Sequence, residues 1–372
     1  MRRWYQLAKN VVKSNFGRLD HPMKLTFILT YNCNTRCQMC NIWARDSRGQ
    51  MTVEEVERFF AKNRRFNWVN LSGGEIFLRK DLMEIVRSLF RHSRDLFLLD
   101  FPTTGQTPEK IENAAREIIG LKPKRLLVTV SLDGPPEVHD QIRRTKGAFD
   151  RCLETFERLR SIKPSGPLRA FFGVTLSRFN QGRLADIHAA VRERIPWIEP
   201  SDFHVNVAQE SGHYYQNEGF AVREGIDEAL DREIREFVGK KPLPITPVAY
   251  LEHRYQTLVK RFRETGRSPL PCKALASSVF IDPFWKVYPC SMFDAPIGDL
   301  RDVDFDLGKI WHSERALAVR REVEEEKCPH CWTPCEAYQT ILGNLLPRRR
   351  RQAEAAPAPA AGVSPRPIGE PV

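Results

Sequence analysis

Short apolar runs alternate with helix-like stretches along the first two thirds of the chain. The apolar runs predict buried strands, which we place at 24–30, 68–72, 96–101, 125–132, 168–176 and 203–207. Between them, apolar residues recur every three or four positions, which is typical of amphipathic helices. The stretch that follows residue 52 is one example, because Thr52 and Glu55 make a capping-box pattern in front of its apolar face.

Six strand–helix units in series predict an α/β fold. Strands joined by helices form a parallel sheet with right-handed crossovers. Sites of chemistry in such sheets lie at the carboxyl ends of the strands. The motifs described below all follow predicted strands, so we expect them to meet at one edge of the sheet.

The remaining segments differ in composition from this core, which we place at 21–215. Residues 1–20 predict a basic amphipathic helix that packs across the end of a barrel, with a membrane-surface role as the alternative. Residues 216–265 predict a helical connector, and residues 266–340 predict a small Cys-rich unit. The Arg-, Ala- and Pro-rich stretch 341–372 predicts a disordered tail.

Composition and charge narrow the class of protein only slightly. The 372 residues, 41% of them hydrophobic, suffice for one large and one smaller domain. Much of the net charge of +11 lies in 1–25 and 347–372, so it says little about a site. Because the sequence shows neither a secretory signal nor a stretch of about 20 apolar residues, we expect a cytoplasmic protein.

Nine cysteines carry the main chemical signal. Eight of them fall into two groups, and the ninth, Cys152, lies in an apolar helical pattern that predicts a buried position. The tight spacings within the groups suit metal ligation better than disulfides. We therefore expect reduced thiolates that bind metal.

The first group is Cys33, Cys37 and Cys40, directly after the first predicted strand. Three thiolates can hold three irons of a [4Fe–4S] cluster, which leaves the fourth iron open to a small molecule that chelates through an amine and a carboxylate. A zinc site or an ordinary electron-transfer cluster are the alternatives. Both usually have four protein ligands, and no fourth is adjacent.

The segment CNTRCQMC resembles the CxxxCxφC signature of the radical S-adenosylmethionine (SAM) superfamily. The resemblance implies a partial (β/α)6 TIM-like barrel in which the cluster binds SAM. It makes Cys33, Cys37 and Cys40 both metal ligands and catalytic residues. Met39 stands at the φ position, which is commonly aromatic, and its thioether can pack against an adenine ring.

Two further motifs resemble SAM-binding elements of the same superfamily. Gly73, Gly74 and Glu75 end the second predicted strand and look like the GGE motif, which binds the methionine amine of SAM. A tight strand–helix turn is the structural alternative. After the fourth strand, the resemblance implies that Ser131 contacts the SAM carboxylate or ribose, that Asp133 faces the site, and that Arg143 pairs with the carboxylate.

Further predictions concern residues that lie near these motifs in the sequence. Thr104, where the superfamily commonly has Asn, is expected to be architectural and not a ligand. His139 and Asp140 suggest a capping arrangement at a helix N-terminus. Asn180 and residues 207–209 are expected to edge the adenine pocket.

The second cysteine group resembles the SPASM and twitch extensions of radical SAM enzymes. Its members are Cys272 and Cys290, which flank a predicted β-hairpin at 279–289, and Cys328, Cys331 and Cys335. Full SPASM domains use seven or more cysteines, so five imply one auxiliary [4Fe–4S] cluster held by the first two and by two of the last three. The SPASM pattern has Gly where this chain has Trp285. A structural zinc that includes His330 is the alternative.

The resemblance implies an enzyme that reductively cleaves SAM to a 5′-deoxyadenosyl radical, which abstracts hydrogen from a substrate C–H bond. It also implies a flavodoxin- or ferredoxin-type electron donor. We expect a peptide or protein substrate, with a sugar, lipid or other small metabolite as the alternative. A non-enzymatic iron–sulfur protein for electron transfer or scaffolding is the alternative from another class. No nucleic-acid partner is expected, and the N-terminal helix offers a peripheral membrane contact.

Overall fold

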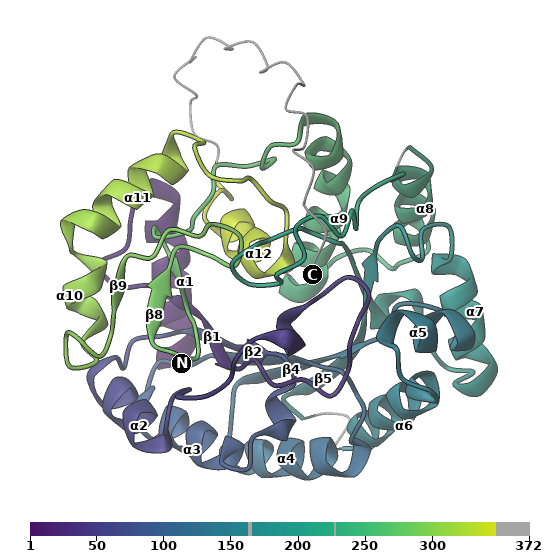
Figure 1. The fold of residues 1–372 in the computed structure, drawn as a ribbon, viewed down its shortest axis with the longest axis horizontal. Helices are drawn as coiled ribbons and strands as arrows, with labels where there is room; N and C mark the ends of the chain where they lie inside the picture. The colour runs from purple at the N-terminus through teal and green to yellow at the C-terminus, as the bar shows by residue number, and fades with distance from the viewer. Residues whose placement is uncertain (163–165, 227, 347–372) are drawn as a thin grey trace, which may run out of the picture.

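The computed structural model describes residues 1–162, 166–226 and 228–346. Its centre is a curved sheet with helices on the outer, convex side (Figure 1). Six parallel strands lie side by side in chain order: β1 (Lys24–Thr30), β2 (Trp68–Gly73), β3 (Leu98–Thr103), β4 (Arg125–Ser131), β5 (Leu168–Leu176) and β6 (Phe203–Val207). The predicted partial (β/α)6 barrel is therefore confirmed, and β1, β5 and β6 have the predicted bounds.

Helices that follow the strands cover the outer face of the sheet. They are α2 (Val53–Lys62), α3 (Leu82–His92), α4 (Pro108–Gly120), α6 (Ala148–Ser161) and α7 (Leu184–Arg194). A short additional helix, α5 (Pro136–Arg143), lies between β4 and α6. Short 3-10 turns occur at Ile42–Ala44, Ile76–Leu78 and Pro200–Asp202. The apolar faces of these helices pack on the outward side chains of the strands and make the main core.

Side chains along each strand alternate between this core and the inside of the barrel. In β2, Val69 and Leu71 belong to the main core, whereas Trp68, Asn70 and Ser72 line an internal cavity. The alternation follows from the two-residue period of a strand. Although most of these residues are buried, one face of the sheet is apolar and the other carries polar groups.

Helix α1 (Arg2–Phe16) lies across the amino ends of the strands. The Trp4 ring lies 4.3 Å from the ring of Phe97, between their centroids, and the Asn10 side chain donates to Asn67 Oδ1 over 2.7 Å. An ion pair joins Arg2 to Asp95. Because Asn67 and Phe97 immediately precede β2 and β3, these contacts close the amino end of the barrel.

The C-terminal part extends the same sheet and does not form a detached unit. Helices α8 (Glu228–Gly239) and α9 (Pro247–Thr265) lead to β7 (Ser278–Ile281), which pairs with β1 in parallel. Strands β8 (Lys286–Tyr288) and β9 (Gly298–Asp299) follow in antiparallel order, so the predicted hairpin is present. Helices α10 (Leu307–Trp311), α11 (Glu314–Glu324) and α12 (Pro334–Leu342) complete the described chain.

Helix α12 lies within the concave side of the sheet, beside α9 (Figure 1). It therefore covers the part of the inner face that the six-stranded barrel leaves open. Among the described residues, no helix is long and apolar enough to cross a membrane. The prediction of a disordered tail at 341–372 is wrong at its start, because Ile341 and Leu342 belong to α12 and residues up to 346 are described. Residues 347–372 lie outside the described residues.

Candidate active site

A cavity of about 360 Å³ occupies the inside of the barrel. Every one of the six barrel strands contributes to its wall, together with the loop after β1, the segment after β6, α9 and the start of α12. One end lies at the carboxyl ends of the strands, where the predicted motifs meet. The other end lies among residues near the amino ends of β1, β2 and β3.

The cluster loop reaches the carboxyl-terminal end of this cavity. Cys33, Cys37 and Cys40 all line it, and the Thr35 hydroxyl lies 3.4 Å from Cys33 Sγ and 3.3 Å from Cys37 Sγ. Burial raises the pKa of the Cys33 thiol and raises that of Cys40 to about 12. A metal that binds these sulfurs must therefore displace their protons.

The two glycines after β2 allow the chain to approach the cluster loop closely. A Cβ atom on Gly73, whose φ is +144°, would lie 2.2 Å from the carbonyl oxygen of Thr30. A Cβ atom on Gly74 would lie 2.2 Å from the carbonyl oxygen of Asn32 and 2.9 Å from Cys33 Cβ. Both glycines line the cavity, and both are required by the backbone of the cluster loop itself.

Glu75 is placed differently from its expected role as a ligand to the SAM amine. Its side chain is buried and does not line the cavity. One carboxylate oxygen accepts from the Thr103 hydroxyl and from the amide and hydroxyl of Thr104, and the other accepts from the Phe77 amide. In this structure Glu75 ties the end of β2 to the end of β3 through Thr103 and Thr104, and Thr104 also lines the cavity.

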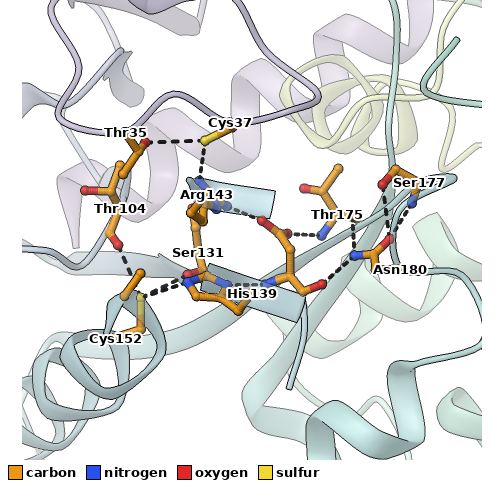
Figure 2. Close-up of polar contacts among 12 residues, drawn as sticks. Thr35, Cys37, Thr104, Ser131, His139, Arg143, Cys152, Thr175, Ser177 and Asn180 are labelled. Atoms are coloured by element: carbon orange, nitrogen blue, oxygen red, sulfur yellow. Dashed lines mark hydrogen bonds and ion pairs between the residues drawn. The ribbon is translucent and has the colours of Figure 1, made fainter. Parts of the chain in front are cut away.

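Arg143 presents a buried positive charge to the cluster loop. Its guanidinium donates to Cys37 Sγ over 3.5 Å and is paired with the Asp133 carboxylate (Figure 2). Burial would lower the pKa of Arg143, but Asp133 and Cys37 outweigh it, so the pKa is raised and the group stays charged. Arg143 Nε lacks a hydrogen-bond partner among the described residues, and Arg143 lines the cavity.

Asp133 supports Arg143 and does not itself reach the cavity. Its second carboxylate oxygen accepts from the Thr175 amide over 2.9 Å, and its carbonyl accepts from the Asn180 side chain over 2.7 Å (Figure 2). The Asp133 amide donates to His139 Nδ1 over 2.9 Å. Asp133 therefore positions the guanidinium from behind, and Asn180 holds Asp133 in place without edging the pocket.

His139 and Cys152 complete this network away from the cavity. Burial lowers the pKa of His139 well below its usual range, so the ring is neutral. Because Nδ1 accepts from Asp133, Nε2 carries the proton, and it lies 3.6 Å from Cys152 Sγ (Figure 2). Cys152 is buried in α6 as predicted. Asp140 accepts from the Gly147 and Phe149 amides and so caps the start of α6.

Other predicted residues are distributed along the same wall. Met39 and Ser131 line the cavity, as do residues 207–209. The segment 211–217, which joins the two cysteine groups, carries no motif by which it could have been predicted. His213 Nε2 lies 2.9 Å from the Cys290 carbonyl, and the Asn217 side chain donates to the Met39 carbonyl over 2.9 Å. Tyr215 packs against the aromatic cluster beside the loop and against the second cysteine group.

Four thiols of the second cysteine group lie together, and the fifth, that of Cys335, lies apart. Cys272, Cys290, Cys328 and Cys331 share a small apolar cluster with Ala274, Met292 and Val323. Burial raises the pKa of all four thiols, to about 12 for Cys272. Cys335 is absent from this cluster and instead lines the central cavity.

The hairpin between Cys272 and Cys290 accommodates a tryptophan in an unusual backbone conformation. Trp285 has a φ of +70°, a left-handed value that favours glycine. Its ring is buried against those of Phe59 and Phe305, at centroid distances of 5.3 Å and 5.0 Å, and its indole N–H donates to Glu55 over 3.0 Å. The turn therefore has the backbone that the glycine of the SPASM pattern would supply.

Two protein-family models match the chain in the regions of the two cysteine groups. Residues 27–181 match the radical SAM superfamily model, and residues 272–332 match the SPASM model, an iron–sulfur cluster-binding domain. The chain therefore contains a radical SAM domain followed by a SPASM domain. The SPASM match spans Cys272, Cys290, Cys328 and Cys331 and ends before Cys335.

Curated relatives of this radical SAM protein include proteins from bacteria and an archaeon. The chain is 24% identical to the antilisterial bacteriocin subtilosin biosynthesis protein AlbA of Bacillus subtilis over 81% of the chain and 60% of AlbA. It is 32% identical to the mycofactocin maturase MftC of Mycolicibacterium smegmatis over 49% of the chain and 46% of MftC. It is 24% identical to the AdoMet-dependent heme synthase of Methanosarcina barkeri over 83% of the chain and 88% of that protein.

The fold is also that of a solved structure that contains S-adenosylmethionine. Streptococcus suis SuiB bound to S-adenosylmethionine superposes with a TM-score of 0.55 at 14% identity, over 84% of this chain and 70% of SuiB. SuiB has also been solved with its precursor peptide SuiA. At this identity the likeness concerns the fold alone, and the chain spans about half to two thirds of AlbA and MftC.

The side chains of this radical SAM protein fit two iron–sulfur clusters. The three thiols of the cluster loop line one cavity, which suits a cluster with one iron open to SAM. Arg143 lines the same cavity, and its Nε has no hydrogen-bond partner among the described residues. Four further thiols share one apolar site, which suits a fully ligated auxiliary cluster. No three or more His, Cys, Asp or Glu side chains in the described ranges converge closely enough to hold one metal ion.

Proposed function

We propose that this chain is an enzyme that reductively cleaves SAM and abstracts a hydrogen atom from a C–H bond of a peptide substrate. The observation that carries the proposal is the shared cavity. It places the three thiols of the cluster loop and the partnerless Arg143 Nε at one end, and it continues into a polar chamber at the other. The thiols and the polar chamber thus belong to one continuous cavity.

The residues of the loop would hold the cluster, and neighbouring side chains would hold SAM. When bound, the cluster supplies the single electron that breaks a C–S bond of SAM, which no side chain can provide. Arg143 would pair with the SAM carboxylate while Asp133 keeps the guanidinium oriented. Met39 would pack against the adenine and Ser131 would donate to the carboxylate or the ribose.

Cys272, Cys290, Cys328 and Cys331 would hold one auxiliary [4Fe–4S] cluster. Their common apolar site and the range of the SPASM match support this set over one that includes Cys335. The auxiliary cluster would accept an electron from the substrate or anchor it. The first cluster would receive its electron from a flavodoxin- or ferredoxin-type donor. A reducing cytoplasm would keep all nine thiols available for this chemistry.

The names of two similar proteins support a peptide substrate. AlbA is a bacteriocin biosynthesis protein, and SuiB binds a precursor peptide. A small metabolite is the second candidate, and one observation favours it. The chain covers 88% of the heme synthase, more than it covers of AlbA.

The test of the activity is SAM cleavage by anaerobically reconstituted protein with dithionite. We expect 5′-deoxyadenosine from the unaltered chain and none above background when Cys33, Cys37 and Cys40 are all changed to Ala. Removal of residues 348–372 serves as the control and should leave cleavage intact. Persistent 5′-deoxyadenosine from the triple variant would refute the assignment.

The test of the substrate class is a mass change in a candidate peptide. A short peptide encoded beside this gene, incubated with the reconstituted protein, SAM and reductant, should change in mass. If the peptide stays unmodified while 5′-deoxyadenosine forms, the peptide assignment fails and the small-metabolite alternative gains support.

A further inference from the structure

The inner end of the cavity, away from the cluster loop, carries buried polar groups that the SAM site does not use. Asn70 on β2 and Asp100 on β3 are neighbours in sheet register and both line the cavity. The Asn70 side-chain nitrogen donates to Asp100 Oδ2 over 2.6 Å. Because a carboxylate only accepts, the Asn70 side-chain nitrogen must face Asp100, and the oxygen Oδ1 of the same amide is not bonded to it.

Asn70 Oδ1 is an acceptor without a donor. Asn70 is 6% exposed, and Oδ1 has no hydrogen-bond partner among the described residues. Each oxygen of its neighbour Asp100 already accepts one hydrogen bond, from the Trp68 indole and from Asn70. A buried acceptor without a partner is unfavourable, so a donor from a ligand would be favoured here.

Thr333 supplies a second unused polar group at the same end. It is the N-cap residue of α12, a position where a threonine hydroxyl usually accepts from the helix backbone, yet it makes no such bond. Thr333 is 1% exposed, and its hydroxyl has no partner in the described part of the chain. Thr333 and Asn70 both line the cavity.

Besides Arg143 at the cluster loop, the cavity wall carries Lys24, Asp100 and Glu252, and Glu252 is paired with Lys241. Lys24 is buried, lies 4.4 Å from the centroid of the Trp68 ring, and donates to the Cys335 carbonyl and to Gln339. A carboxylate in this chamber would meet Asp100, and an ammonium would meet Lys24. An uncharged group that both donates and accepts fits better than either.

Cys335 places a thiol beside this chamber. Burial raises the pKa of Cys335 to about 11, with Lys24 lowering it and Glu336 and Asp100 raising it, so the group is a neutral thiol at neutral pH. These neighbours locate the sulfur close to the chamber wall. The thiol therefore provides a chemical handle for probing what the chamber binds.

We propose that the inner chamber binds an uncharged amide of the substrate, whose N–H donates to Asn70 Oδ1 and whose carbonyl accepts from the Thr333 hydroxyl. The proposal rests on the proposed function only in calling the occupant the substrate. A backbone or side-chain amide of a peptide has this pairing of donor and acceptor. The chamber would thus hold the peptide while the other end of the cavity holds SAM.

Disulfide exchange at Cys335 tests the proposal without any SAM cleavage. The anaerobic protein, with both clusters reconstituted, is equilibrated with the disulfides of mercaptopropanamide and of mercaptopropionate, which differ only in the amide or carboxylate end. Cystamine supplies the ammonium counterpart. Peptide mass spectrometry then measures the Cys335 adduct as reductant concentration rises. Iron content, measured before and after, shows that the clusters stay intact.

The amide adduct should persist to about tenfold higher reductant than the carboxylate or ammonium adducts, as expected for one or two buried hydrogen bonds. Thr333→Val should reduce this preference several-fold. Thr107→Val is the matched control, because Thr107 is also an N-cap threonine whose hydroxyl has no partner in the described residues, and it does not line the cavity. Asn70→Asp should shift the preference toward the ammonium probe.

Equal persistence of the amide and carboxylate adducts would overturn the proposal, as would a Cys335 that forms no adduct in the cluster-loaded protein. A preference unchanged by both Thr333→Val and Asn70→Asp would overturn it as well. Failure of SAM cleavage would leave the amide preference standing, so the two proposals fail separately.

Discussion

At the scale of single residues, Trp285 shows how a side chain can stabilise a backbone conformation that suits another residue type. The left-handed φ costs about 1–2 kcal/mol for a residue with a Cβ. Burial of the indole among aromatic rings, together with its bond to Glu55, outweighs that cost. The sequence motif shows that Trp285 replaces a glycine of the SPASM pattern. Only the structure shows that Trp285 keeps the left-handed backbone conformation that a glycine would adopt.

Trp285→Gly is therefore expected to destabilise the protein in spite of the relieved backbone. Loss of a buried tryptophan costs about 3–5 kcal/mol, and relief of the backbone returns about 1–2 kcal/mol. The free energy of unfolding should fall by about 1–4 kcal/mol in urea titrations. Trp285→Phe, which retains a ring and the strain, is the matched comparison. A Gly variant more stable than the unaltered chain would contradict this account.

At the scale of elements, the contact between the end of β2 and the cluster loop determines where the three thiols lie. The strands and most helices could be predicted from the sequence because they depend on local apolar periodicity. The helix α5 and the segment 211–217 could not be, because their positions depend on partners far along the chain. Glu75 shows the same limit, since its hydrogen bonds to the end of β3 are not encoded near it.

Gly74→Ala is expected to disturb the cluster loop while the barrel stays folded. The added Cβ would lie 2.2 Å from the Asn32 carbonyl oxygen, so the loop backbone must move. We expect about four fewer irons per chain after reconstitution, with an unchanged far-ultraviolet circular dichroism spectrum.

Gly120→Ala is the control for Gly74→Ala, because a Cβ there meets no atom within 4 Å. It should retain its full iron content. Full iron loading in the Gly74 variant would show that the loop tolerates the shift.

At the scale of the whole molecule, Cys335 lies apart from the other four C-terminal cysteines, and this separation could not be predicted from the sequence. The spacing of the cysteines alone left Cys328, Cys331 and Cys335 as candidates for two ligand positions of the auxiliary cluster. The choice depends on the packing of α12 against the barrel, a contact between residues about 300 positions apart, as in the bond from Lys24 to the Cys335 carbonyl. Such long-range contacts leave no periodic signal in the sequence.

Iron analysis of two cysteine variants tests this separation. The unaltered chain should bind about eight irons after anaerobic reconstitution, for two [4Fe–4S] clusters. Cys290→Ser should reduce this to about four, whereas Cys335→Ser should stay near eight. Loss of four irons in Cys335→Ser would instead make Cys335 a ligand of the auxiliary cluster.

The closure of the barrel by both ends of the chain has a consequence for biosynthesis. The cluster loop lies within the first 40 residues, but the wall opposite β1 is completed only by α12, near residue 340. On the ribosome, the loop thiols therefore emerge long before the element that covers the inner end of their cavity. A nascent or truncated chain lacking α12 would leave that inner end open, so the cavity is complete only once the residues of α12 have been made.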